Sequence, residues 1–258
     1  MGWIMPKDKI AIFIPAYKAV KTLDSAIRRI PRELKSKVAE IYVFDDASDD
    51  NTYLAGIGYK YLHHIKNLNI YKNTKNLGYG GNQKKGYNYA IKKGYDIVVM
   101  LHGDVQYAPE KIPDLIKPIE KGEADVVMGS RILGYPVKQG MPVWKYLGNR
   151  FLTFMENIFL DIHLSEYHTG FRAFRCDALK EIPYNRCSND YDFDTEVILQ
   201  LLLKNKRIKE IPIQTHYGPE SHQISFLLSL GYGFRIMRSL LEYRMHKSGL
   251  KKIRKFDF

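Results

Sequence analysis

The segment VVMLHGDVQYAPEKIP (98–113) combines an apolar run with side chains that can bind a cation. His102, Asp104 and Gln106 alternate directly after the run. A carboxylate and an amide oxygen are suitable ligands for Mg²⁺, whereas an imidazole suits Mn²⁺ better. We therefore expect Asp104 to bind a metal, with Gln106 and His102 as the further candidate ligands. Alternatively, Asp104 only caps the turn before the helix expected after Pro109.

Two other groups of carboxylates lie at similar boundaries. Asp45 and Asp46 end the apolar run AEIYVFDD (39–46), and Asp194 and Glu196 stand in FDTE, where a helical pattern begins. A carboxylate at a strand end can accept hydrogen bonds from a ligand, and one within hydrogen-bond reach of a hydroxyl can act as a base. The simpler alternatives are helix capping for the first pair and a favourable interaction with a helix dipole for the second.

The segment KNLGYGGNQKKG (75–86) places three glycines where a helix is expected to begin. Glycines at such a position let the backbone approach a ligand and direct its amide groups at it. The segment does not match the GxxxxGK[ST] phosphate-binding loop or the GxGxxG pattern of dinucleotide-binding folds. By itself it predicts a ligand contact without specifying the class of ligand.

The first 130 residues alternate between apolar runs and helical patterns. The runs are 9–15, 39–46, 68–73, 95–104 and 124–130, and the helical patterns are 18–30, about 50–66, 80–93 and 109–121. Near-continuous apolar strands separated by helices predict an α/β fold with a mostly parallel sheet covered on both faces. Because such sheets bind ligands at the carboxyl ends of their strands, we expect the polar strand ends near Pro15, Asp45 and Asp104 to meet in one crevice.

The alternation fades after residue 135. Segment 143–162 has a helical stripe of Phe151, Phe154, Met155, Ile158 and Phe159. The segment TGFRAFR reads either as a strand with Phe171 and Phe174 in the core or as a functional site around Arg172; a helix and a short strand follow. In the last unit, 223–258, one helical face carries Phe226, Leu230, Phe234, Met237, Leu241 and Met245. This basic, amphipathic tail fits a membrane interface, the protein's own core or a dimer contact.

Composition limits the class of protein. The 258 residues carry a formal net charge of +12 and only two cysteines, Cys176 and Cys187. The charge predicts an anionic partner, such as a phosphate-bearing substrate or an anionic membrane. We do not expect nucleic acid, because no binding motif appears and the basic residues do not coincide with an aromatic platform. Without a leader or a long apolar segment, the chain is expected to be cytoplasmic or peripheral on the inner face of the cell membrane.

The chain resembles the family 2 glycosyltransferases with the GT-A fold, and among them the dolichyl- or polyprenyl-phosphate sugar synthases. The resemblance covers roughly residues 9–222 and rests on seven motifs in order: IPAYK, VFDDASDD, KNLGYGGNQKKG, LHGDVQYAPE, VVMGSR, TGFRAFR and FDTE. It implies a GT-A domain over 1–222, with a nucleotide-sugar-binding half (1–135) and an acceptor half (136–222). The C-terminal tail (223–258) lies outside the resemblance.

The resemblance also implies an activity and the residues that carry it. The expected reaction is the inverting transfer of a hexose from a UDP- or GDP-sugar to a polyprenyl phosphate at the membrane surface, with Mn²⁺ or Mg²⁺ as cofactor. The residues implied on the donor side are Pro15, Tyr17, Asp45, Asp46, Lys75, Asn76, Gly78 and Arg131. On the acceptor side, Asp194 or Glu196 is the implied base, and Arg172, Arg175 and His222 are the implied acceptor-binding residues.

Two departures from the family pattern leave alternatives open. The family carries a D-x-D pair followed by Gln, but His102 replaces the first Asp here. The synthases also carry a basic segment with a lysine near residue 222, and this lysine is missing. The first departure permits a catalytically silent nucleotide-sugar-binding protein. The second permits transfer to a saccharide or glycan hydroxyl, with Asp194 as base.

Overall fold

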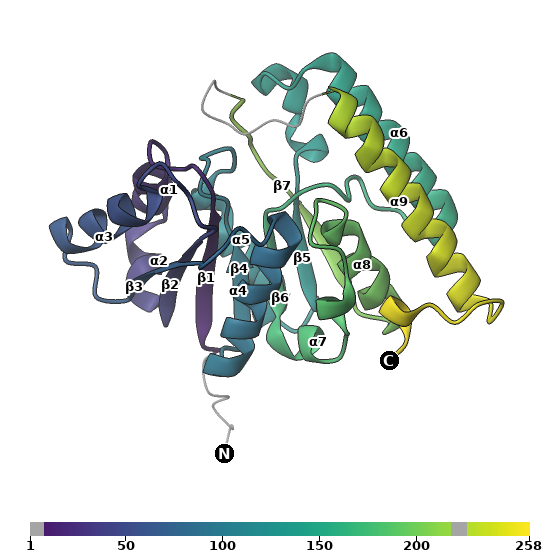
Figure 1. Ribbon diagram of the computed structural model, residues 1–258, viewed down its shortest axis with the longest axis horizontal. Helices are drawn as coiled ribbons and strands as arrows, with labels where there is room; N and C mark the ends of the chain where they lie inside the picture. The colour runs from purple at the N-terminus through teal and green to yellow at the C-terminus, as the bar shows by residue number, and fades with distance from the viewer. Residues whose placement is uncertain (1–7, 218–225) are drawn as a thin grey trace.

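A single mixed sheet forms the centre of the molecule, for which a computed structural model describes residues 8–217 and 226–258 (Figure 1). The strand order is β3-β2-β1-β4-β6-β5-β7. The strands are β1 (Ile10–Ala16), β2 (Glu40–Asp45), β3 (Leu68–Lys72), β4 (Ile97–Met100), β5 (Val126–Ser130), β6 (Arg172–Arg175) and β7 (Ile208–Pro212). The five apolar runs of the first 130 residues are thus confirmed as β1 to β5. The short strand expected after FDTE is β7.

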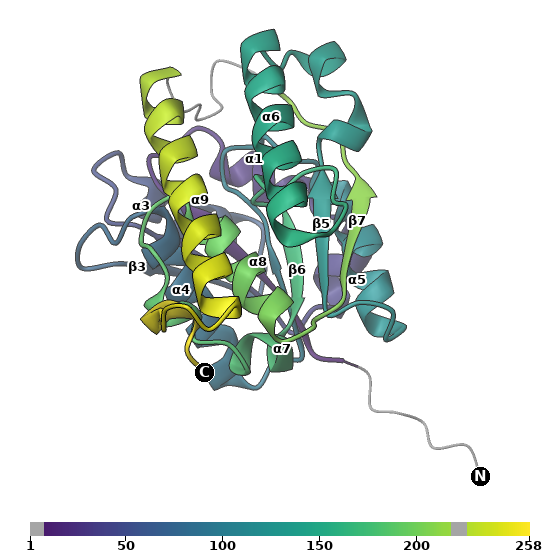
Figure 2. The same cartoon turned by 90° about the vertical axis from the view of Figure 1, so that its right-hand side faces the viewer.

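Helices cover both faces of this sheet (Figures 1 and 2). They are α1 (Leu23–Arg29), α2 (Arg32–Lys37), α3 (Thr52–Leu62), α4 (Tyr79–Lys93), α5 (Ile112–Glu120), α6 (Val143–Leu160), α7 (Cys176–Lys180), α8 (Phe193–Leu203) and α9 (Phe226–Lys247). Short 3₁₀ turns are η1 (Pro109–Lys111), η2 (Ile132–Gly134), η3 (Pro136–Gln139), η4 (Tyr184–Arg186) and η5 (Arg254–Phe256). The predicted two-sided α/β architecture is confirmed.

Two hydrophobic cores lie on the two faces of the sheet, because successive side chains of a strand point in opposite directions. Phe13 of β1 stacks on Tyr42 of β2, with ring centroids 5.2 Å apart, and meets Tyr87 of α4 edge-on. Its neighbours Ile12 and Ile14 belong to the other core, which includes side chains of α1 and α5. This alternation explains why β1 reads as an almost continuous apolar run.

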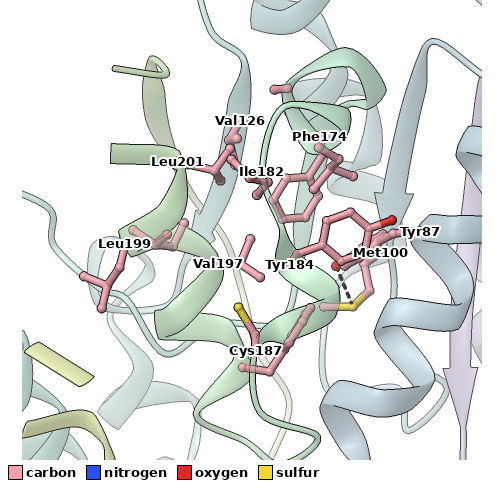
Figure 3. Packing of buried hydrophobic residues seen from close by; sticks show 14 of the residues in the cluster. Tyr87, Met100, Val126, Phe174, Ile182, Tyr184, Cys187, Val197, Leu199 and Leu201 are labelled. Atoms are coloured by element: carbon pink, nitrogen blue, oxygen red, sulfur yellow. Dashed lines mark hydrogen bonds between the residues drawn. The ribbon is translucent and has the colours of Figure 1, made fainter. Parts of the chain in front are cut away.

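Helix α8 closes the first of these cores (Figure 3). Val197 and Leu201 are buried in the cluster that includes Val126 of β5 and Phe174 of β6. Burying one side chain of this size stabilises the folded state by about 1.5–3 kcal/mol. The packing therefore fixes the position of α8 and of Asp194 in its first turn.

Strand β6 runs antiparallel between β4 and β5, whereas the other described strand pairs are parallel. Its first residue, Arg172, pairs with Met100 near the carboxyl end of β4, and its last, Arg175, pairs with Ile97 at the amino end. The two arginines thus lie at opposite edges of the sheet. Residues after 135 complete the sheet begun by residues before 135, and the domain boundaries remain a prediction.

Helices α6 and α9 lie side by side on one flank of the molecule (Figures 1 and 2). Helix α9 also contacts α8, and its Ile236, Leu240 and Tyr243 are buried in the first core. One expected position for the C-terminal tail, against the protein's own core, is therefore observed. Within 8–217 and 226–258, no helix has the length and apolar character needed to cross a bilayer.

Candidate active site

The loop after β4 holds Asp104 in a defined position at the carboxyl edge of the sheet. Asp104 is 8% exposed, and its Oδ1 accepts the backbone N–H of Gln106 at 3.2 Å. Between them, Val105 has a φ of 53°, a left-handed conformation that is rare for a β-branched residue. Such strain costs about 1–3 kcal/mol and concentrates at functional sites. The loop thus holds the Asp104 carboxylate against the backbone of Gln106.

His102 lies between two tyrosine rings on the acceptor side of this loop. Its ring meets Tyr79 and Tyr107 edge-on, with centroids 5.7 and 5.2 Å away. Its Nε2 lies 3.4 Å from the Tyr79 hydroxyl and so close to Gly170 that any side chain there would clash with it. Burial lowers the pKa of His102, against the opposing effect of Asp104, so the imidazole is neutral at pH 7. Only Nδ1 is left to contact a metal or diphosphate.

Asp194 is the acidic residue of FDTE that reaches this site. The Tyr79 hydroxyl donates to its Oδ2 at 2.7 Å, and Gln83 Nε2 donates to its Oδ1 at 3.2 Å. Burial and the nearby carboxylate raise the pKa of Tyr79, so its phenol keeps its proton and remains a donor. Tyr79 thus joins His102 to Asp194. Tyr79 and Gln83 belong to the segment KNLGYGGNQKKG, in which the glycines were the predicted ligand contact.

Arg172 is buried beneath Asp194. Its side chain is 1% exposed and donates to three main-chain carbonyls, those of Thr169, Asp194 and Tyr167, at 2.7–2.9 Å. Its Nη1 also lies 3.6 Å from Asp194 Oδ1. The guanidinium therefore joins the loop before β6 to the first turn of α8.

Two residues predicted for the acceptor side, Arg175 and Glu196, are not brought to this site. Arg175 lies at the amino edge of the sheet, where it pairs with Asp8 at 3.6 Å. Glu196 faces away from the site toward the C-terminal segment and forms a buried ion pair with Lys255. His222 lies outside the described residues.

Asp45 and Asp46 have different hydrogen-bond partners on the donor side. Asp46 accepts the backbone N–H groups of Leu77 and Gly78, at 2.9 and 3.1 Å, and so fixes the start of the glycine segment. Asp45 Oδ1 accepts the N–H of Ser48 at 3.2 Å, but its buried Oδ2 has no partner among the described residues. A buried oxygen without a partner costs about 1–3 kcal/mol. Asp45 is fully buried and is the carboxylate of this pair that keeps an unpaired oxygen.

The other residues predicted on the donor side surround Asp45 at the same edge. Pro15 precedes the last residue of β1, which pairs with Asp45, and Tyr17 follows it with 44% of its surface exposed. Lys75 and Asn76 are exposed in the loop after β3. The side chain of Asn76 accepts the N–H of Gly78 at 2.9 Å. The structure brings the ends of β1, β2 and β4 to one edge of the sheet, as the sequence predicts, and the end of β3 lies beside that of β2.

The glycines at the start of α4 have another role than the one expected. The N–H groups of Gly80 and Gly81 donate to the carbonyl of Asn189, at 2.8 and 3.3 Å. A Cβ at Gly80 would lie only 2.6 Å from Phe193 Cβ. These two glycines permit close packing against the segment before α8. Their amides do not point at a ligand, so that part of the expectation was wrong.

Arg131 forms a buried ion pair at the end of β5. It is 5% exposed, its Nε donates to Glu166 Oε1 at 2.7 Å, and its backbone N–H donates to Oε2 at 2.7 Å. Burial would raise the pKa of Glu166, but Arg131 and the Asn149 amide lower it overall, so the carboxylate stays ionised. Arg131 is thus held in an ion pair that is buried on both sides. Glu166 lies 35 residues after Arg131, and no motif in the sequence indicated that the two residues pair.

Lys145, in the first turn of α6, is a second group that the sequence did not identify. Its ammonium lies 5.4 Å from the centre of the Tyr217 ring. Burial and the charge of Arg131 lower its pKa to about 8, although Glu166 and Asp104 act in the opposite direction. No carboxylate of the described residues lies within ion-pair distance of it. A half-buried cation without a carboxylate partner is a candidate for binding an anion.

The residues around Asp104 fit a cation that binds together with a substrate. In the described part of the chain, no group of three or more His, Cys, Asp or Glu side chains is placed to hold a metal. Asp104 and Gln106 nevertheless offer one carboxylate and one amide oxygen in a fixed loop. A hard cation takes its remaining ligands from phosphate oxygens and water, so a complete protein cage is unnecessary.

Comparison with known proteins identifies the family. The family model described as Glycosyl transferase family 2 matches residues 11–183. The chain belongs to this family. As a family 2 glycosyltransferase, it is 29% identical over 254 residues to UDP-N-acetylglucosamine–dolichyl-phosphate N-acetylglucosaminyltransferase of Methanococcus voltae, covering 94% of this chain and 99% of the relative. It is 26% identical over 212 residues to undecaprenyl-phosphate mannosyltransferase of Micrococcus luteus, and this match covers 80% of this chain and 82% of the relative.

Solved structures confirm the fold of this glycosyltransferase. Glucosyl-3-phosphoglycerate synthase of Mycobacterium tuberculosis, in complex with Mn²⁺, UDP-glucose and phosphoglyceric acid, superimposes with a TM-score of 0.67 and 20% identity. The match covers 92% of this chain and 80% of that one. The GT-A architecture predicted from the sequence is therefore confirmed.

Proposed function

We propose that this glycosyltransferase moves a hexose, with inversion, from a UDP- or GDP-sugar to a dolichyl-type polyprenyl phosphate at a membrane surface. The relatives from M. voltae and M. luteus support the acceptor, because both are named for transfer to a lipid phosphate. The catalytic domain would comprise residues 1–222, with the donor bound by 1–135 and the acceptor by 136–222.

On the donor side, Asp45 would accept a hydrogen bond from the nucleoside through its unpaired Oδ2. Asp104 and Gln106 would hold Mn²⁺ or Mg²⁺ against the diphosphate. When bound, such an ion supplies positive charge that stabilises the leaving nucleoside diphosphate. His102 replaces a carboxylate here, so the protein contributes one negative charge less to the metal than a D-x-D pair would.

The observation that carries the acceptor assignment is Lys145, a half-buried cation near Asp104 without a carboxylate partner among the described residues. A lipid phosphate is already ionised and needs a cation to hold it, whereas a hydroxyl needs a base. The candidate base, Asp194, already accepts hydrogen bonds from Tyr79 and Gln83 on its two oxygens. The geometry therefore favours the phosphate over the hydroxyl.

Transfer assays with the wild-type chain test this function. With UDP- and GDP-sugars as donors and Mn²⁺ or Mg²⁺ present, we expect labelled sugar on polyprenyl phosphate and none on the unphosphorylated polyprenol. EDTA should abolish the transfer, because without a bound cation the Asp104 carboxylate repels the diphosphate and nothing at this position stabilises the leaving group. Transfer to a saccharide in place of the lipid phosphate would establish the hydroxyl alternative. Donor binding without transfer to any acceptor would establish the silent binder.

Replacing Lys145 by methionine should raise the KM for polyprenyl phosphate by about tenfold to a hundredfold, because a charge-assisted hydrogen bond contributes about 1.5–3 kcal/mol. Donor affinity should change little. In the wild type, acceptor affinity should fall as the pH rises through about 8, where Lys145 loses its charge. Lys145→Met should lack this pH dependence.

The matched control is Lys138→Met. Lys138 is exposed on η3, and its ammonium lies 5.6 Å from the Tyr135 ring, an arrangement much like that of Lys145 over Tyr217. An equal rise in KM for both variants would mean that general surface charge, and not a phosphate site at Lys145, binds the acceptor.

A further inference from the structure

Helix α6 has its polar side toward the protein and its apolar side toward solvent. Its buried residues are Asn149, Thr153, Glu156 and Leu160. The outward stripe consists of Val143, Leu147, Phe151, Phe154 and Ile158, each between 54% and 62% exposed. A surface helix of a protein in water normally has the opposite arrangement. The sequence predicted a stripe that shares Phe151, Phe154 and Ile158 with this one, but not the side of the helix on which the protein lies.

Specific polar contacts fix α6 in this orientation. Glu156 is completely buried, with its Oε2 3.0 Å from His168 Nε2 and its Oε1 accepting the Thr195 hydroxyl at 3.2 Å. About two turns earlier, the Asn149 amide donates to Glu166 at 2.7 Å. Rotating the helix to bury its apolar stripe would break each of these contacts. The outward position of the stripe is therefore part of the folded structure.

The neighbouring helix α9 adds a second apolar stripe on the same flank. Leu230, Phe234 and Leu241 are 51%, 78% and 52% exposed, while Ile236 and Leu240 are buried against the core. The two helices are in contact: the Arg244 side chain donates to the carbonyl of Ile158 at 3.2 Å. Together the two stripes form what we call the α6/α9 face.

The charges around the α6/α9 face are mostly positive. Between residues 131 and 160 the one carboxylate is that of Glu156, which is buried, while Arg150 is exposed; the next carboxylate, Asp161, is exposed at the carboxyl end of α6. On α9 the one carboxylate is that of Glu242, which is paired with Arg238 and with Lys255. The face thus combines exposed apolar side chains with positive charge.

We infer that the α6/α9 face docks on an anionic lipid bilayer, with its apolar stripes among the lipid headgroups and its cations near the lipid phosphates. A second copy of the chain fits this face less well, because a two-fold contact would place positive charge against positive charge. Lys145 lies in the first turn of α6, at the start of the outward stripe. A lipid phosphate in the bilayer surface would therefore enter beside it, a point that rests on the proposed function.

Vesicle co-sedimentation of the full chain tests the inference. The vesicles consist of phosphatidylcholine alone or mixed with phosphatidylglycerol, without polyprenyl phosphate or nucleotide-sugar, so failure here is separate from failure of the proposed function. Wild type should sediment with the anionic vesicles and be released by salt. Replacing Phe151 and Phe154 together by Asp should lower the partition coefficient at least about tenfold, because two apolar side chains leave the interface and two negative charges enter it.

The matched control replaces Tyr61 and Leu62 by Asp. Both are exposed, at 71% and 75%, and they lie at the end of α3, which is far from α6 and α9 in Figure 1. This variant should bind as wild type does, and circular dichroism should show that both variants fold. Equal binding of the two variants, or wild-type binding that is independent of the anionic lipid, would overturn the inference. So would a dimer in light scattering that the Phe151/Phe154 variant dissociates, because the face would then belong to a second copy.

Discussion

Asp104→Asn should lower the rate of sugar transfer by about a hundredfold or more while the protein remains folded. Metal-ion stabilisation of developing charge contributes several kcal/mol, and each loss of about 1.4 kcal/mol reduces the rate tenfold. Asparagine keeps an oxygen that can accept the N–H of Gln106, so the turn at Val105 can persist. The variant should therefore show the wild-type melting temperature in the absence of ligands. Its stabilisation by UDP or GDP with Mn²⁺ should disappear.

The control for this variant is Asp114→Asn on α5. Asp114 is 53% exposed and pairs with Lys111 at the surface at 2.9 Å, so its charge should matter for neither metal nor transfer. Unchanged transfer in Asp104→Asn would contradict the assigned metal site. If wild type itself showed no metal-dependent stabilisation, the replacement by His102 would be the first position to examine, with His102→Asp as the reverting variant.

Arg172→Ala should lower the free energy of unfolding by about 3–5 kcal/mol, the range observed when one partner of a buried ion pair is removed. Three carbonyls that accept from the guanidinium would lose their donor, and Asp194 would lose its buried positive neighbour. Denaturant unfolding followed by circular dichroism measures this change. Arg172→Lys should recover only part of the loss, since an ammonium cannot reproduce the planar arrangement of donors.

The matched control is Arg175→Ala on the same strand. The Arg175 side chain is 28% exposed, and its contacts are a 3.6 Å pair with Asp8 and one carbonyl, that of Ile119. We expect a change of about 1 kcal/mol or less. The alternative outcome is that Arg172→Ala lowers the free energy of unfolding by no more than Arg175→Ala does. If it also lost acceptor binding, the acceptor role first expected for Arg172 would be the better assignment.

Much of the sheet could be predicted from the sequence because β1, β2, β4 and β5 are buried on both faces and read as apolar runs. The direction of β6 could not, because four residues with arginine at each end fit either orientation. The apolar stripes of α6 and α9 were visible as periodicities. A periodicity shows which residues share one side of a helix, but it does not show whether that side packs against the protein or faces solvent.

The candidate site could also be predicted in part. Strand ends in a parallel sheet share an edge, which is why Asp45 and Asp104 could be placed together. The sequence did not show which of Asp45 and Asp46 keeps an unpaired oxygen, because this depends on the hydrogen bonds from the glycine segment to Asp46. Nor did it show the partner of Arg131, because Glu166 lies 35 residues further along the chain. Lys145 reads as an ordinary surface lysine in the sequence, because only the folded chain brings α6 over the site.

The position of β6 has a consequence for the order in which the chain can fold during synthesis. When residues 1–135 have left the ribosome, β1 to β4 can pair with one another, but β5 has no strand beside it, since its neighbours are β6 and β7. The edge of β4 stays open until residues 172–175 are made. An open strand edge is a site for pairing with other nascent chains. Joining β5 to the first four strands therefore depends on the late arrival of one four-residue strand, β6, and β7 is added after it.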